Sequence, residues 1–290
     1  MRRARTSVRD ALDGAVTALG AGGCETPRLD AELLTAHVLG VDRARLLTDS
    51  ELAVEGPAAR ALQAAVRRRA VDREPVAYII GARHFRRLEL RVDHRALIPR
   101  PESELLVEVA LTAPAGASVL DLCTGSGAVA LAVKDERPDL AVTGSDISAP
   151  ALALARENAA RLGLEVSFVQ ADLLDGLDDR YDLVLANPPY VADGDRASLA
   201  PEITRHEPSL ALFAGADGLD VVRRIYKEAG ARPGLASLAV EVADGQAEHA
   251  AALARQAGFT AVSKLPDLAG TDRVVIAARP GKSPTGALIA

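Results

Sequence analysis

The chain has 290 residues, of which 49% are hydrophobic and 26% are charged. A chain of this length can bury one large core or two unequal ones, and its composition is that of an ordinary globular protein. Its apolar runs are shorter than the roughly 20 residues that span a bilayer. The cysteines, Cys24 and Cys123, lie far apart and form neither a disulfide framework nor a zinc pattern. We therefore expect a cytoplasmic protein that holds no metal.

The net charge of −6 hides an asymmetry between two parts of the chain. Residues 1–100 carry 18 Arg and Lys against 13 Asp and Glu, whereas residues 101–290 carry 16 against 27. Because nucleic-acid binding needs a large basic surface, the acidic second part argues against direct contact with nucleic acid. The six arginines from Arg83 to Arg100 could face an acidic or RNA-rich partner, or form a solvated surface around a hairpin.

Residues 1–75 predict a small all-helical domain. Ser7 is suited to cap one helix, and Thr26 followed by Pro27 is suited to begin another. A shorter helix around residues 43–47 and a longer one from Pro57 follow. Short loops between these helices indicate a small bundle.

Residues 76–101 predict a linker that contains a β-hairpin. Residues 78–80 form a short apolar run that Gly81 interrupts. Phe85 then precedes an alternating apolar pattern over residues 88–92, which is typical of a strand. Prolines stiffen the chain before the next helix begins.

Residues 102–280 predict a doubly wound α/β domain. Apolar runs predict strands at 118–122, 140–143, 166–169, 183–186, 236–242 and 273–278, and helical patterns separate them at 128–134, 149–162, 219–229 and 247–257. Strands that are apolar throughout indicate a parallel sheet covered by helices on both faces, and ligands of such sheets bind at the carboxyl ends of the strands. Residues 281–290 have the composition of a disordered tail.

A glycine loop follows the first predicted strand of this domain. It has the sequence Cys123-Thr124-Gly125-Ser126-Gly127, whose glycines let a ligand approach the backbone closely. The third glycine of the dinucleotide-binding pattern is missing. Asp146 at the end of the next strand can accept bonds from ribose hydroxyls, and Asp172 after the following strand can meet an adenine amino group on which Leu173 packs. These residues predict an adenosine ligand without phosphates, although both acids could instead cap helices or turns.

The tetrapeptide Asn187-Pro188-Pro189-Tyr190 follows another predicted strand. An amide nitrogen is a poor nucleophile, so a methyltransferase site can hold both of its hydrogens with two acceptors. The Asn187 side-chain oxygen and the Pro188 carbonyl can be these acceptors, since the prolines fix the backbone, and Tyr190 can lie against the flat amide or base. The chemistry predicted is methylation of a planar nitrogen by S-adenosylmethionine, with Asn187, Pro188 and Tyr190 as catalytic residues. A proline turn capped by Asn is the alternative.

Several further stretches carry a family resemblance. They are Glu74–Gly81, Phe85, Leu97–Glu104, Glu207-Pro208 and Asp217–Leu219. With the tetrapeptide at Asn187–Tyr190, they make the chain from about Glu74 to Arg279 resemble the HemK/PrmC family, the protein-(glutamine-N5) methyltransferases of peptide chain release factors. Cys123 departs from the resemblance, because many members have glycine there.

The resemblance implies an α/β class I S-adenosylmethionine-dependent methyltransferase fold. Its Rossmann-like seven-stranded sheet would end in an antiparallel strand and follow a helical substrate-recognition domain. The implied target is the glutamine of the Gly-Gly-Gln motif in release factors, and the cofactor product is S-adenosylhomocysteine. By position, residues 124–127, Asp146, Leu173 and Asn187 would line the cofactor, residues 187–190 would hold the glutamine, and Phe85 and Arg100 would lie near the reacting end.

We expect a release factor methyltransferase that acts as a monomer, and three alternatives to this function remain open. A glutamine methyltransferase of a ribosomal protein would share the chemistry. An N6-adenine methyltransferase of nucleic acid would flip a similar planar amino group into the site, but the acidic second part and the absence of tryptophan argue against it. A cofactor-binding scaffold without catalysis would not need the intact Asn187 and Tyr190.

Overall fold

The computed structural model describes residues 6–179 and 181–280, so the predicted tail at 281–290 lies outside the described residues. The chain divides into two compact units. We call them the helical unit, which comprises the chain up to Ala82 together with Ala200–His206, and the sheet unit, which comprises Arg83–Leu199 and the chain from Glu207 onward. Within the described ranges, no helix combines the length and the apolar character needed to cross a membrane.

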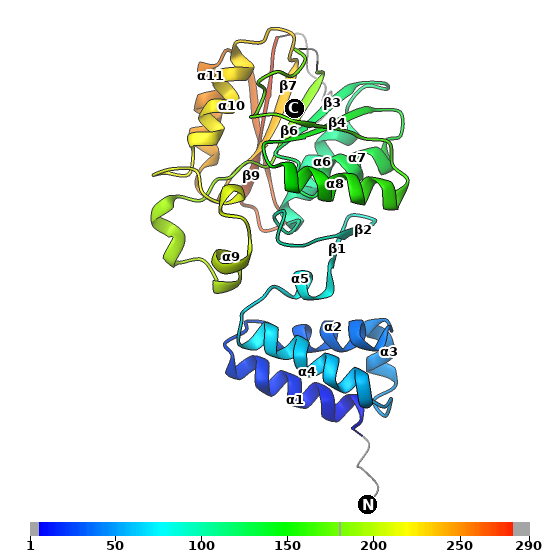
Figure 1. Ribbon diagram of the computed structural model, residues 1–290. Helices are drawn as coiled ribbons and strands as arrows, with labels where there is room; N and C mark the ends of the chain where they lie inside the picture. Colours follow the sequence, from blue (N-terminus) through cyan, green and yellow to red (C-terminus); the bar gives the residue numbers. More distant parts are fainter. Residues whose placement is uncertain (1–5, 180, 281–290) are drawn as a thin grey trace, which may run out of the picture. The chain divides into compact units, whose positions relative to one another are not determined.

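The helical unit is a small bundle, as the sequence predicts (Figure 1). Its helices are α1 (Val8–Ala21), α2 (Pro27–Leu39), α3 (Arg43–Thr48), α4 (Gly56–Ala70), α5 (Val76–Ile80) and α9 (Pro201–His206). Ser7 caps α1 as predicted, in a reciprocal capping box with Asp10. Thr26 precedes α2 but makes no side-chain cap; its hydroxyl donates to Asp30 instead. The apolar run at 78–80 forms α5.

Buried ion pairs hold α9 within the helical unit. The Arg69 side chain on α4 is only 7% exposed and donates to Asp30 Oδ2 at 2.7 Å and to Glu202 Oε1 at 3.0 Å. Arg73 donates to the other Glu202 oxygen at 2.7 Å. Burial of a guanidinium is tolerated because carboxylates satisfy it. The sequence did not predict α9, whose six residues lack an apolar stripe.

The sheet unit contains a seven-stranded sheet in the order β5-β4-β3-β6-β7-β9-β8. Its strands are β3 (Ser118–Leu122), β4 (Ala141–Asp146), β5 (Ser167–Gln170), β6 (Leu183–Ala186), β7 (Ser237–Glu241), β8 (Ala261–Pro266) and β9 (Asp272–Ala278). β9 runs antiparallel to both of its neighbours, β7 and β8, while the pairings among β5, β4, β3, β6 and β7 are parallel. The α/β class, the seven strands and the antiparallel final strand are thereby confirmed.

Helices cover both faces of this sheet. The unit's remaining elements are α6 (Glu104–Leu111), α7 (Ala128–Glu136), α8 (Ala149–Leu162), α10 (Asp220–Gly230), α11 (Ala247–Gln256), the 3-10 turns η1 (Pro101–Ser103), η2 (Asp193–Ala197) and η3 (Ser209–Ala211), and the predicted hairpin β1 (Ala82–Phe85) and β2 (Leu88–Arg91). In β6, Leu183 and Leu185 pack in the core that includes α6 and α7, whereas Val184 and Ala186 pack in the core that includes α10 and α11. The two pairs of helices lie on opposite sides of the sheet (Figure 1). Every side chain of β6 is therefore buried, which explains its continuous apolar run.

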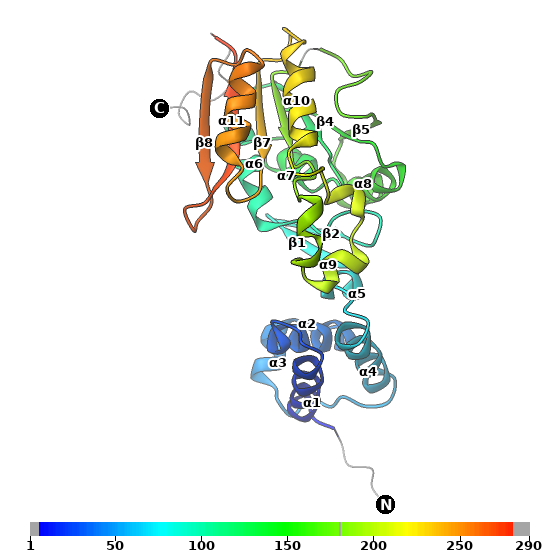
Figure 2. The same ribbon diagram turned by 90° about the vertical axis from the view of Figure 1, so that its left-hand side faces the viewer.

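Two strands differ from the sequence prediction. Residues 166–169 were predicted as a buried strand, but β5 is an edge strand and Val169 is 40% exposed. β8 was not predicted, because it is partly exposed and carries the polar Ser263 and Lys264 among its apolar residues. The two strands form opposite edges of the sheet (Figure 2), and edge strands need no continuous apolar run.

Candidate functional site

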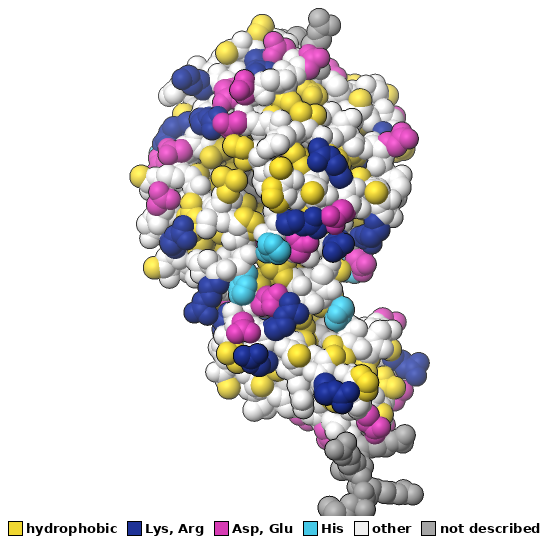
Figure 3. Space-filling view, viewed as in Figure 1, with side chains coloured by type: hydrophobic (Ala, Val, Ile, Leu, Met, Phe, Trp, Pro, Cys, Tyr) yellow, Lys and Arg dark blue, Asp and Glu magenta, His cyan; other side chains and the backbone are white. Residues whose placement is uncertain are grey.

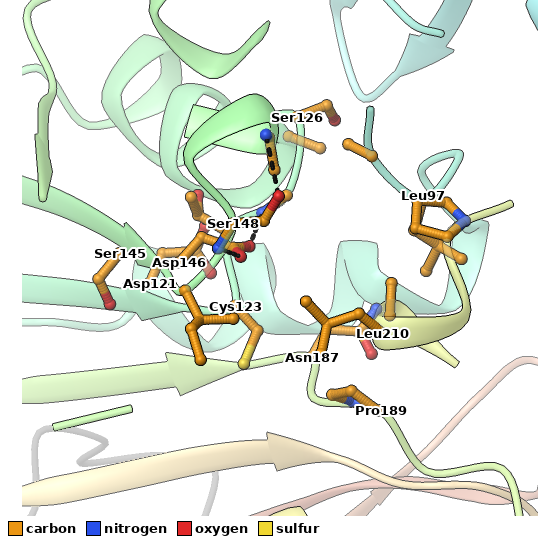
Figure 4. Close-up of a pocket in the computed structure, with 18 of the residues that line it drawn as sticks. Leu97, Asp121, Cys123, Ser126, Ser145, Asp146, Ser148, Asn187, Pro189 and Leu210 are labelled. Atoms are coloured by element: carbon orange, nitrogen blue, oxygen red, sulfur yellow. Dashed lines mark hydrogen bonds between the residues drawn. The ribbon is translucent and has the colours of Figure 1, made fainter. Parts of the chain in front are cut away.

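A cavity lies at the carboxyl ends of the parallel strands in the sheet unit. The segments after β3, β4, β5 and β6 contribute one part of its lining, and residues 95–100 and 208–213 contribute another. Figure 4 shows this arrangement, with Asp146 and Cys123 on one side and Leu97 and Leu210 on the other. The position is the one predicted for a ligand of a doubly wound sheet.

The glycine loop contributes backbone to the cavity. Gly125 has a φ of +56° and lies in open space, with no atom closer than 4.0 Å to an added Cβ. Cys123 has a φ of +57°, a left-handed conformation that costs a non-glycine residue energy. Gly127 does not line the cavity; an added Cβ there would lie 3.1–3.2 Å from Leu131 and Ala155, so its role is packing between helices. The other four predicted residues of the loop line the cavity.

Asp146 is fixed by backbone amides. Its Oδ2 accepts from the Gly125 N–H at 2.9 Å and its Oδ1 from the Ser148 N–H at 2.8 Å. Burial raises the pKa of this carboxyl, and the amide hydrogen bonds oppose that shift. Two oxygens held in place at the cavity wall retain lone pairs for hydroxyl groups of a ligand.

The residues predicted to meet an adenine also line the cavity. Asp172 is half exposed and pairs with Arg224 at 3.0 Å, so its carboxylate has a cationic partner from α10. Leu173 is 7% exposed and has a φ of +54°. Ile147, which the sequence did not single out, is 47% exposed and lines the same cavity. An exposed apolar side chain at such a wall suits the face of a flat ring.

The tetrapeptide after β6 is only partly exposed to the cavity. Asn187 and Pro189 line it (Figure 4), whereas Pro188 and Tyr190 are not among its lining residues. Asn187 Nδ2 donates to Ser103 Oγ at 2.8 Å, which leaves Asn187 Oδ1 as the end that can accept. The Tyr190 hydroxyl donates to Glu241 at 3.4 Å, and burial raises the pKa of Tyr190, so it remains a donor.

Two contacts fix the backbone carbonyl of Tyr190. Its carbonyl oxygen accepts from Gln246 Nε2 at 3.0 Å. Gly218, with a φ of +73°, lies so close that an added Cβ would overlap this carbonyl. The motif at residues 217–219 therefore needs glycine at its centre for contact with the tetrapeptide.

The two remaining predicted residues lie in different places. Arg100 lines the cavity and donates to Glu207 Oε1 at 2.6 Å, while Glu207 Oε2 accepts from the Ile98 N–H at 3.1 Å. Phe85 is 2% exposed, packs in the core with Leu88 and does not line the cavity. The structure therefore places Phe85, the last residue of β1, in the core beside Leu88 and Leu90 of β2 and away from the cavity lining.

Sequence reasoning missed two buried polar residues at this site. Ser103 is 3% exposed and Glu241 is 1% exposed. Glu241 ends the apolar strand β7, and an acid at the carboxyl end of a buried strand was the available signal. Among the described residues, no group of three or more His, Cys, Asp or Glu is placed to hold a metal ion.

Comparison with known proteins identifies the family. A family model described as "PrmC N-terminal domain" matches residues 10–81, and one described as "Methyltransferase small domain" matches residues 101–211. The release factor glutamine methyltransferase of Deinococcus radiodurans is 44% identical over 280 residues, which cover 94% of this chain and 99% of the relative. The chain belongs to the release factor glutamine methyltransferase family.

Another member of this family and a solved structure agree with the assignment. The release factor glutamine methyltransferase of Cereibacter sphaeroides is 43% identical over 93% of this chain and 98% of its own length. The structure of the T. thermophilus 16S rRNA N2 G1207 methyltransferase, a complex with AdoMet and guanosine, matches with a TM-score of 0.50 at 20% identity. It covers 68% of this chain and 49% of that one, and at this identity it supports the methyltransferase fold alone.

Proposed function

We propose that this chain transfers a methyl group from S-adenosylmethionine to the side-chain amide nitrogen of glutamine in the Gly-Gly-Gln motif of peptide chain release factors. The observation that carries the proposal is identity of 44% over nearly the full length of a release factor glutamine methyltransferase, together with Asn187 at the cavity. Family models match both the N-terminal part of this chain, at residues 10–81, and the part at residues 101–211.

The cavity fits the adenosyl cofactor. The open backbone at Gly125 allows close approach of the cofactor's amino-acid part. The fixed carboxylate of Asp146 suits the ribose, and the apolar side chain of Ile147 suits the base. Cys123, Thr124, Ser126, Asp172, Leu173 and Asn187 complete the proposed cofactor contacts. When bound, S-adenosylmethionine supplies a methyl group activated by the sulfonium.

The residues of this chain contribute to the reaction by positioning the reacting groups. Asn187 Oδ1 and the Pro188 carbonyl accept the two amide hydrogens. The hydrogen bonds of Asn187 to Ser103 and of Tyr190 to Glu241 hold the segment in place. Arg100, held by Glu207, and Pro189 line the substrate side. Alignment of the reacting atoms is worth on the order of 7–11 kcal/mol when the geometry is good. The amide proton leaves to water.

The proposal extends to organisation and partners. We propose a helical substrate-recognition domain over residues 1–75, a hairpin linker over 76–101 and a catalytic domain over 102–280, in a monomer of the cytoplasm that contacts no nucleic acid. On the face shown in Figure 3, Lys and Arg side chains alternate with Asp and Glu in both units and gather in no single basic patch. This face therefore lacks the extended basic surface that binding of a nucleic acid needs.

Radiolabelled S-adenosylmethionine offered with a release factor, a ribosomal protein and duplex DNA in parallel tests the function. We expect label in the release factor and none in its Gly-Gly-Ala variant. Asn187→Ala should lower the rate at least 100-fold, as loss of a preorganised polar contact does, while the cofactor Kd stays within a few-fold. Label that appears only in DNA would overturn the proposal.

A further inference from the structure

The side chain of Asn158 on α8 is a buried amide that connects two parts of the sheet unit. Asn158 is 0% exposed and is not among the residues that line the cavity. Its Oδ1 accepts from the Arg91 N–H at 2.8 Å, and its Nδ2 donates to the carbonyls of Arg91 and Ser126, each at 3.0 Å. One side chain thus joins the end of β2 to the glycine loop.

These three partners determine which way the Asn158 amide is turned. Its NH₂ group has two hydrogens, one for each carbonyl, and its oxygen faces the Arg91 N–H. If the amide were turned over, NH₂ would face the N–H and the oxygen would face two carbonyl oxygens. The contact therefore requires an amide, and a carboxylate of the same shape cannot replace it.

Close packing of α8 against the glycine loop brings Asn158 within reach of Ser126. An added Cβ at Gly127 would lie 3.2 Å from the Cβ of Ala155, which is one helical turn before Asn158. Ser126 is 3% exposed, so loss of the hydrogen bond from Asn158 would leave its carbonyl with little access to water. The position of the loop therefore depends on its contact with α8.

The same helix holds the segment that leads from β2 to another part of the cavity lining. Arg91 ends β2, and residues 95–100 line the cavity. Arg95 donates to Glu157 Oε1 on α8 at 2.7 Å, and Ala96 packs with two buried residues of α8. Helix α8 is thus in contact with both the glycine loop and this segment.

We propose that Asn158 is a positioning residue for the cofactor, which acts through Ser126 to hold the glycine loop where S-adenosylmethionine binds. Ser126 lines the cavity, and the N–H of the neighbouring Gly125 donates to Asp146 Oδ2 at 2.9 Å. A shift of Ser126 would therefore displace the backbone of Gly125 and the carboxylate that this backbone orients. The inference rests on the proposed function for the identity of the cofactor.

Calorimetric titration of the full chain with S-adenosylhomocysteine tests this role without turnover. Asn158→Asp keeps the shape of the side chain and the contact with the Arg91 N–H, but it turns an oxygen toward two carbonyls. If the loop then occupies its binding position for about a tenth of the time or less, the apparent Kd rises about tenfold or more. A single methyl transfer to a release factor at saturating S-adenosylmethionine should stay within about threefold of the wild-type rate, because only uniform binding is lost.

Ser237→Ala is the matched control for loss of a buried hydrogen bond. Ser237 is also 0% exposed, and its hydroxyl donates to the Asp182 carbonyl at 2.8 Å. It begins β7, at the end of the strand away from the cavity, and does not line the cavity. Its substitution should lower Tm and leave the Kd for S-adenosylhomocysteine within about twofold of the wild type.

The possible outcomes of the titrations are distinguishable. A wild type that binds no S-adenosylhomocysteine contradicts the cofactor of the proposed function. A wild type that binds it, with an Asn158→Asp variant of unchanged Kd, overturns the inference alone. An equal rise of Kd in Ser237→Ala overturns it as well, because any loss of stability would then weaken binding.

Hydrogen exchange of the wild type covers the case in which Asn158→Asp does not fold. If Asn158 holds the glycine loop in place, the amides of residues 123–127 should be protected before any cofactor is added. Exchange as fast as that of the exposed turn η2 (Asp193–Ala197) would overturn the inference.

Discussion

Substitution of Gly218 by alanine tests how the backbone of the tetrapeptide is held. A Cβ at this position would overlap the Tyr190 carbonyl oxygen and lie 2.7 Å from Gln246 Nε2, the group that donates to the same carbonyl. The methyl group fits only if the Tyr190 backbone moves. Gly245 is the matched control, because its φ of +78° resembles the +73° of Gly218 but no atom lies within 4 Å of an added Cβ.

The expected magnitudes separate the two variants. A left-handed conformation costs alanine about 1–2 kcal/mol, of which the stiffer unfolded chain returns about 0.4–1 kcal/mol, so Gly245→Ala should cost about 1 kcal/mol. Displacement of packed backbone adds about 1–3 kcal/mol for Gly218→Ala. At about 2–4 °C per kcal/mol, Tm should fall by about 2–4 °C for Gly245→Ala and by roughly 5–15 °C for Gly218→Ala.

Scanning calorimetry and the methyl-transfer assay measure both effects. We expect Gly218→Ala to lower the methylation rate at least tenfold at a temperature where it is folded, since Asn187 and Pro188 precede the displaced Tyr190. Gly245→Ala should transfer methyl groups at nearly the wild-type rate. If both variants lost equal Tm and rate, the left-handed conformation alone would account for the losses. That result would refute the overlap with the Tyr190 carbonyl as their cause.

Three other substitutions probe the strain, the buried acid and the buried ion pairs. Cys123→Gly should raise Tm by about 2–4 °C in calorimetry by relief of about 1 kcal/mol of left-handed strain, with no loss of cofactor affinity; a lower Tm would contradict the strain. Burial raises the pKa of Asp121 from its ordinary value of about 4 to about 7. The folded state therefore holds this proton where the unfolded state loses it, and stability falls as pH rises from about 4 to 7. Asp121→Asn should flatten that fall by about 1 kcal/mol per pH unit in denaturant titrations, and an unchanged slope would count against it. Glu202→Ala should cost about 2–4 kcal/mol, since it leaves Arg69 with one of its two carboxylate partners, whereas Glu51→Ala at an exposed pair should change denaturant midpoints little; equal effects would argue against burial as the cause.

The sequence predicted the strands that are buried on both faces and the helices that are buried along one face. The strands at 118–122 and 183–186 and the helix at 149–162 have the predicted bounds, because continuous apolar runs and helical periodicity follow directly from burial between layers. β8 and α9 escaped prediction for the opposite reason: one is a partly exposed edge strand, and the other is a short helix held by charges.

Some residues of the site could likewise be placed from the sequence, and others could not. Asp146, Asp172 and Asn187 could be placed because the carboxyl ends of parallel strands meet at one edge of a sheet. The hydrogen bond from Asn187 Nδ2 to Ser103 Oγ could not, since it joins the segment after β6 to the chain just before α6, 84 residues away in sequence. The burial of Phe85 in the core could not be predicted either, because sequence similarity marks a position without showing where its side chain lies.

Asp146, clamped by the amides of Gly125 and Ser148, has a consequence for turnover. In the proposed site, Asp146, Asp172 and Leu173 all address the adenosine moiety, which is unchanged when the methyl group has left. Because the Asp146 carboxylate is already oriented, we expect it to bind the demethylated cofactor as tightly as S-adenosylmethionine. We therefore expect the demethylated product to compete with reloading, and the rate of successive transfers to follow the ratio of the two cofactor forms rather than the supply of methyl donor alone.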